Sequence, residues 1–381
     1  MGTGNSSPLY WGSPHSQPSP SSSGLSFTDI AKIPETFFRR LPQVVSARTV
    51  GTPIVLDGAW RNLGLDRMFG GRPGAARPMI ERAAFAIVAY CALDARSTSS
   101  VSEWVREDVS ISGTEKNSQA DWKAAAERLG QASVWERAEQ SARANVGSQP
   151  VYLVNDHSAP GGEFALAVSQ DCWPLLLRPW PDQDNPRRSS ADLSQPLPED
   201  LEARIVSIQP VKHAAAAVSG TLKEIELAGH ERVSYCLLDG QSAGTRLIFV
   251  QTWDRSRSWC RIDEVIEVRG DGPADHEIIC GYLDSLRVRR EFVYLLGRPS
   301  RPPFTESDQA ASAWPVISWI ALLLTRQVEH DTGQPWPKVR TELQRVQDLT
   351  VTVPQAGVRL PSGRTPLSPG QRAILSRYPG I

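Results

Sequence analysis

The 381-residue chain has no surplus of charge, because 41 lysines and arginines stand against 42 aspartates and glutamates. Proteins that grip DNA by neutralising its phosphates usually carry a local basic excess. The overall balance therefore gives no support for DNA binding, although it leaves room for a basic patch on one face. The sequence also lacks a Gly-x-x-x-x-Gly-Lys phosphate loop and a Gly-x-Gly-x-x-Gly fingerprint, which argues against those classes of nucleotide-binding protein.

Paired cysteines and long apolar runs are missing as well. The five cysteines are scattered and include no Cys-x-x-Cys pair, so we expect neither a disulfide framework nor a zinc ribbon, and we predict a reducing, cytoplasmic location. The longest apolar run, residues 313–324, is interrupted by Pro315 and Ser318 and falls short of the roughly 20 residues that cross a bilayer. The first residues do not read as a signal peptide, so no membrane association is expected.

What is present divides the chain by composition and periodicity. We predict a disordered Ser/Pro-rich tail, an N-terminal helical domain, a mixed sheet domain and a C-terminal helical region, over residues 1–42, 43–148, 149–300 and 301–381. Within the helical domain, Ser100 and Glu103 have the spacing of a capping box. Within the sheet domain, short apolar runs such as residues 151–154 predict strands, and residues from about 273 to 296 predict a helix.

Both ends of the chain carry motifs in a recognisable order. The N-terminal motifs are an apolar helix, a turn and an acidic-aromatic pair, at residues 76–91, 92–97 and Glu103-Trp104. The C-terminal motifs are Tyr282, Arg287, Val288 and Phe292 in one helical register, then Arg301-Pro302-Pro303-Phe304, then Gly333, Trp336, Val339, Arg340 and Leu343. In this order the motifs resemble those of insertion-sequence DDE transposases, in the Tyr-Arg-Glu-Lys subgroup.

The resemblance implies a fold of the α/β (α+β) class. We expect a mixed sheet similar to ribonuclease H, here degenerate or truncated, flanked by N- and C-terminal helical regions. In that family three carboxylates hold two Mg²⁺ ions, which activate water or a 3′ hydroxyl for attack on a phosphodiester. The implied partner is DNA, and assembly into a homo-oligomer stays open.

The family's three carboxylate positions map onto this chain incompletely. Asp156 follows the run VYLV and is the candidate first catalytic and metal-binding carboxylate. Asp254 is a weaker candidate for the second, because it lies closer to the third position than in the family, which predicts an internal deletion. The register puts Arg289 at the third position, and a guanidinium cannot ligate a cation. Glu291 is a weak substitute, since two residues turn the helix by about 200°.

Three functions stay open on the sequence. The first is a transposase-like protein with an incomplete metal-binding triad, which would catalyse magnesium-dependent strand transfer or phosphodiester cleavage if active. The second is a domesticated, non-catalytic factor that binds DNA or protein. The third is a recruited scaffold with unrelated small-molecule chemistry, which predicts an apolar pocket near Asp156 or His157. We expect transposase ancestry with loss of the standard triad.

Overall fold

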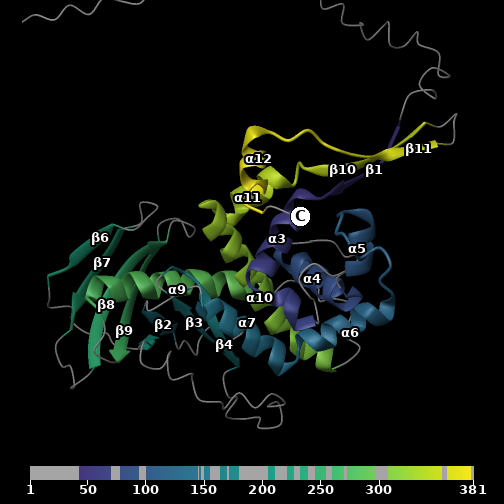
Figure 1. Cartoon of the computed structure of the whole chain (residues 1–381). Coiled ribbons are helices and arrows are strands. Elements are labelled where there is room, and N and C mark those ends of the chain that lie inside the picture. The colour runs from purple at the N-terminus through teal and green to yellow at the C-terminus, as the bar shows by residue number, and fades with distance from the viewer. Residues whose placement is uncertain are drawn as a thin grey trace, which may run out of the picture. The chain divides into compact units, whose positions relative to one another are not determined.

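A computed structural model of the chain (Figure 1) describes residues 43–69, 78–93, 100–144, 146, 150–154, 164–169, 171–179, 205–210, 221–226, 232–238, 245–254, 260–269, 273–296, 308–353 and 358–378. The predicted tail 1–42 and Asp156 lie outside these residues. Two compact units are distinguished, one of Met1–Val45 with Thr350–Pro361 and one of Ser46–Leu349 with Ser362–Ile381. The larger unit holds the eight-stranded sheet and all the described helices.

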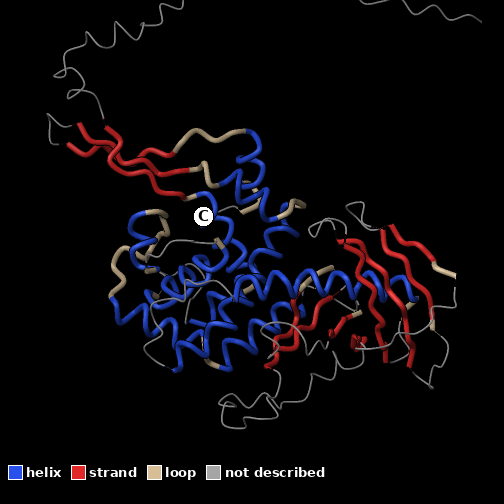
Figure 2. The backbone as a smooth tube through the Cα atoms, turned by 180° about the vertical axis from the view of Figure 1, so that it is seen from behind, coloured by secondary structure: helices blue, strands red, loops and turns tan. Residues whose placement is uncertain are grey.

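Helices and strands alternate in blocks along the chain, and Figure 2 distinguishes the helices in blue from the strands in red. The described helices are α3 (Gly51–Asn62), the 3₁₀ helix η1 (Leu65–Phe69), α4 (Met79–Ala92), α5 (Val101–Glu107), α6 (Gln119–Leu129), α7 (Ala132–Ala144), α9 (Asp275–Leu296), α10 (Asp308–Thr332), α11 (Trp336–Leu343) and α12 (Pro369–Leu375). The described strands are β1 (Gln43–Thr49), β2 (Val151–Val154), β3 (Phe164–Ser169), β4 (Pro174–Pro179), β5 (Ile205–Pro210), β6 (Lys223–Glu226), β7 (Arg232–Leu237), β8 (Thr245–Asp254), β9 (Cys260–Arg269), β10 (Gln347–Val353) and β11 (Val358–Arg364). The mixed α/β class predicted from the sequence is confirmed at this level.

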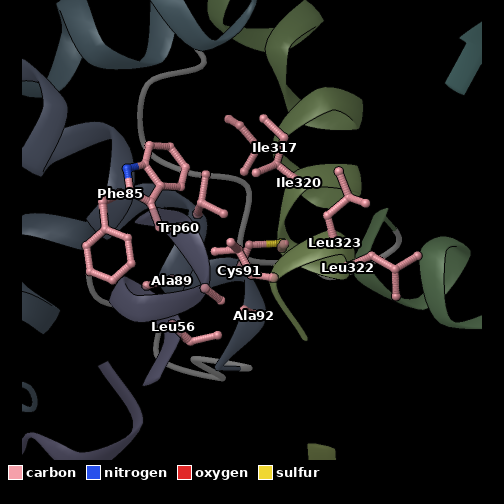
Figure 3. Packing of buried hydrophobic residues seen from close by; sticks show 14 of the residues in the cluster. Leu56, Trp60, Phe85, Ala89, Cys91, Ala92, Ile317, Ile320, Leu322 and Leu323 are labelled. Atoms are coloured by element: carbon pink, nitrogen blue, oxygen red, sulfur yellow. The ribbon is translucent and has the colours of Figure 1, made fainter. Parts of the chain in front are cut away.

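Helix α4 is the centre of the helical core. Its sequence, MIERAAFAIVAYCA, is buried from Glu81 to Ala92, as expected for a helix that is apolar all round. It packs against α3, α6 and α10, and its alanines leave room for close helix approach. Figure 3 shows Ile317, Ile320 and Leu323 of α10 beside Cys91 of α4. This core therefore joins residues near 90 to residues near 320.

Two predicted helical regions contain strands, which corrects the sequence interpretation. Residues 43–49 form β1, and the predicted C-terminal helical region contains β10 and β11, in a three-stranded sheet of order β1-β10-β11. The β10 sequence, QDLTVTV, ends in four β-branched residues and alternates apolar with polar side chains from Leu349 onward, which suits a pleated strand. The partner of β1 lies about 300 residues later in the chain, so a local reading of residues 43–49 could not reveal it.

The larger sheet has eight strands in the order β4-β3-β2-β5-β9-β8-β7-β6. Its neighbouring strands are antiparallel except for β2 and β5, which run parallel with Val154 opposite Ile208. The strand at residues 151–154 was predicted, whereas β5 and β6 were not. Because β2 and β5 run parallel, the chain leaves both strands at the same edge of the sheet.

Helix α9 crosses one face of this sheet (Figure 1) and is fixed against β2 by a close approach. A Cβ atom at Gly281 would lie 2.2 Å from Cε2 of Tyr152, so only glycine lets the helix lie this near the ring. The Tyr152 hydroxyl donates to the carbonyl of Glu277 at 3.2 Å, and burial raises the pKa of Tyr152 to about 12. At the start of α9, Arg246 of β8 donates to Asp275 at 3.1 Å.

We predict that Gly281→Ala lowers the free energy of unfolding by about 1–3 kcal/mol, the usual cost of overpacking a core. The control is Gly370→Ala in α12, where a Cβ would meet nothing nearer than Glu342 Oε1 at 3.4 Å. Urea unfolding of both variants measures the difference. Equal stability of the two variants would show that Tyr152 does not hold α9 at this distance.

Candidate functional site

The carboxyl ends of β2 and β5 mark the edge of the sheet at which the predicted first carboxylate would work. In open sheets with parallel strands, ligands gather outside the carboxyl ends at the point where the strand order changes direction. Here β2 has antiparallel β3 on one side and parallel β5 on the other. Asp156 follows Val154 by two residues and lies outside the described residues.

The strand register does not bring Asp254 to this edge. Val154 of β2 lies opposite Ile208 of β5, and Ile208 lies opposite Val268 of β9. On the next strand, β8, the residue opposite Val268 is Arg246. Asp254 is the last residue of β8, eight positions beyond Arg246. At roughly 3.3 Å per residue that is about 26 Å along the strand. Paired metal ions lie only about 4 Å apart, so Asp254 is not in reach of a site at the end of β2.

The part of α9 that carries Arg289 and Glu291 lies toward the opposite end of β2. The turn between β3 and β4 follows Ser169, which pairs with Val151, the first residue of β2. Arg287 donates from Nη2 to Cys172 Sγ in this turn at 2.8 Å. The chain leaves β2 for Asp156 at the other end of the strand. Of the three predicted positions, the structure describes Asp254 at the end of β8 and Arg289 on α9, whereas Asp156 lies outside the described residues.

Arg289 and Glu291 face different surroundings, as the helical rotation predicts. Arg289 is 8% exposed and shares its side of α9 with Tyr282, Ser285 and Phe292, which are also buried. Glu291 is half-exposed and forms an ion pair with Arg326 of α10. Arg326 also pairs with Glu329. Burial alone lowers the pKa of Arg326, but Glu291 and Glu329 outweigh burial and raise it.

A second carboxylate on this side of α9, that of Asp284, is also paired with an arginine. Asp284 lies 3.3 Å from Arg287, and burial raises the pKa of the Asp284 carboxyl despite that neighbour. Cys172 is buried, has a φ of 63°, and has a raised thiol pKa, chiefly through burial. A raised pKa keeps the thiol protonated and unreactive at neutral pH. The cluster is thus a set of internal ion pairs around an inert thiol.

These placements decide what the region can do chemically. Two-metal catalysis needs carboxylates free to bind cations, whereas Asp284 and Glu291 are each paired with an arginine. Within the residues described, no group of three or more His, Cys, Asp or Glu side chains is arranged to hold a metal ion. The geometry favours a structural role for the charged face of α9.

The helical core contains a buried charge network that the sequence interpretation missed. Glu81 is fully buried and accepts from Trp60 Nε1 at 2.8 Å and from Arg82 Nε at 2.6 Å. Arg82 also donates to Asp57 at 2.9 Å. Burial alone lowers the pKa of Arg82, but the hydrogen bond that Arg82 donates to Glu81 and the charge of Asp57 raise this pKa overall. The signal in the sequence was the pair Glu-Arg inside an otherwise apolar helix.

A small hollow of about 160 Å³ adjoins this network. Its apolar wall includes Ile54, Phe85 and Ile111, and its polar rim includes Asp348 and Arg364, which are 3.2 Å apart. The volume is below the roughly 300–1,000 Å³ of a typical small-molecule site. The hollow belongs to α3 and α4 rather than to the end of β2, so it does not provide the pocket that a recruited scaffold would need near Asp156.

Comparisons with known proteins give no family for the chain. No family model matches the sequence, and no curated protein is significantly similar to it. A search of the described helices finds none with the length and apolar character of a membrane span.

We predict that Arg82→Met lowers the free energy of unfolding by about 3–5 kcal/mol, because Glu81 would keep a buried charge with no cation beside it. The control is Arg106→Met, since the Arg106–Glu107 side chains are 69% and 62% exposed and such surface pairs contribute about 1 kcal/mol or less. Chemical unfolding compares the two variants. A similar small loss in both would mean that the network is not closed off from water.

Proposed function

We propose that this chain is a transposase-like protein of the DDE type that no longer assembles a two-metal centre and binds DNA without cutting it. The ancestry is supported by the order of the motifs at the two ends of the chain. It is also supported by the mixed sheet, with a parallel β2–β5 pair at whose carboxyl edge Asp156 follows, and by α9 lying against β2. A ribonuclease-H-like origin of this sheet is part of the proposal.

One observation carries the loss of catalysis. At the position of the family's third carboxylate, this chain has a buried arginine, Arg289. The nearest glutamate, Glu291, forms an ion pair with Arg326 of α10. A buried guanidinium repels a divalent cation, and an ion-paired carboxylate must give up its partner before it can bind one. Asp156 by itself supplies one oxygen donor group, whereas the reaction requires two Mg²⁺ ions held together.

The proposal predicts DNA binding without magnesium-dependent cleavage. Fluorescence anisotropy with a labelled duplex should show affinity that falls linearly with salt on a double-logarithmic plot. Incubation of supercoiled plasmid with protein and Mg²⁺ should leave the plasmid intact over hours. Asp156→Asn should behave like the unchanged protein in both assays.

Two results would contradict the proposal in different ways. Magnesium-dependent nicking that disappears in Asp156→Asn would restore catalysis to the protein. Absence of affinity for duplex DNA at low salt would remove the DNA-binding function and leave protein binding as the remaining role of the helical regions. Glu291→Gln serves as a further control, because nicking lost in this variant would identify a metal ligand rather than a structural partner of Arg326.

A further inference from the structure

The charges of the chain are unevenly distributed along its length. Residues 336–378 contain seven lysines and arginines but only two acidic residues, although the whole chain is balanced. The described helices of this segment are α11 and α12, which pack against each other. Glu342 joins them, since its side chain accepts from Ser368 at 2.9 Å and its carbonyl accepts from Gln371 at 2.9 Å.

Four of these cations point to solvent and are not used inside the molecule. Within the described part of the chain, no ion pair engages Lys338, Arg345, Arg372 or Arg377, and all four residues are exposed. Of the two acids of the segment, Asp348 pairs with Arg364, whereas Glu342 accepts a hydrogen bond from Ser368 and keeps its charge, so the four cations face one remaining acid. The surface of the α11–α12 pair therefore carries a net positive charge that has no internal counterpart.

Favourable interactions with the helix dipoles do not explain the positions of all four cations. Arg372 lies in the last turn of α12, where a cation interacts favourably with the helix dipole. Lys338 lies in the first turn of α11, where a cation is unfavourable. Arg345 and Arg377 lie beyond the helix ends. Three of the four cations therefore gain nothing from a helix dipole, and all four are exposed and accessible to an external anion.

We propose that the α11–α12 pair is the surface that contacts the phosphate backbone of duplex DNA, an inference that rests on the proposed DNA-binding function. Duplex DNA presents one negative charge per about 1.7 Å of its axis, so several cations on one small surface can be neutralised together. A membrane surface fits less well, because peripheral helices also insert large apolar side chains. Among the described residues, the exposed large apolar side chains all lie outside α11 and α12.

The test replaces all four cations by glutamine, in Lys338→Gln, Arg345→Gln, Arg372→Gln and Arg377→Gln combined. The matched control removes four exposed cations from the α5–α7 region, in Arg106→Gln, Lys116→Gln, Lys123→Gln and Arg137→Gln combined. Both variants lose the same net charge. Urea unfolding midpoints close to that of the unchanged protein establish that each variant is folded before binding is measured.

The measurement is the slope of log affinity against log salt for a labelled duplex. Each phosphate contact contributes about 0.9 to this slope, so the α11–α12 variant should lose about 3–4 from it and the control variant less than about 1. Equal losses in the two variants overturn the inference and leave DNA binding intact. No binding by the unchanged protein overturns the proposed function, and binding to anionic vesicles but not to DNA assigns the surface to a membrane instead.

Discussion

The approach of α9 to Tyr152 is the contact on which the arrangement of the sheet region depends. Because Gly281 has no side chain, the helix lies directly on the ring, and its course is then fixed from Arg246 of β8 at one end to the β3–β4 turn at the other. That course determines the environment of every later residue of α9. It carries Arg289 and Glu291 toward the amino end of β2 and away from the edge at which a metal centre would form.

The charged residues of the molecule follow one rule in its interior and another on its surface. Inside, Glu81 with Arg82 and Glu291 with Arg326 are paired, as buried or half-buried ions must be to offset their desolvation. A carboxylate used in this way is unavailable for a cation. In residues 336–378 the exposed cations outnumber the acidic residues, which is the arrangement expected where the balancing charge comes from a partner.

The sequence predicted elements that depend on local patterns and missed those that depend on distant partners. The capping box of Ser100 and Glu103 is confirmed, because it is decided within four residues. The strand β1 was missed since its partner comes about 300 residues later. The pairing of Glu291 with Arg326 was missed for the same reason, because helical geometry gives the direction of Glu291 but not the helix it meets. The placement of Asp254 required the strand register, which periodicity does not contain.

The central position of α10 has a consequence for synthesis of the chain. Helices α3, α4 and α6 bury their apolar faces against α10, whose first residue is Asp308. At 5–20 residues per second, the ribosome needs on the order of 10–40 seconds to reach α10 after completing α4. During that interval the nascent helices expose the surface that α10 later covers. We therefore expect the early part of the chain to depend on α10 for stable folding, and we expect truncation before α10 to yield a protein prone to aggregate.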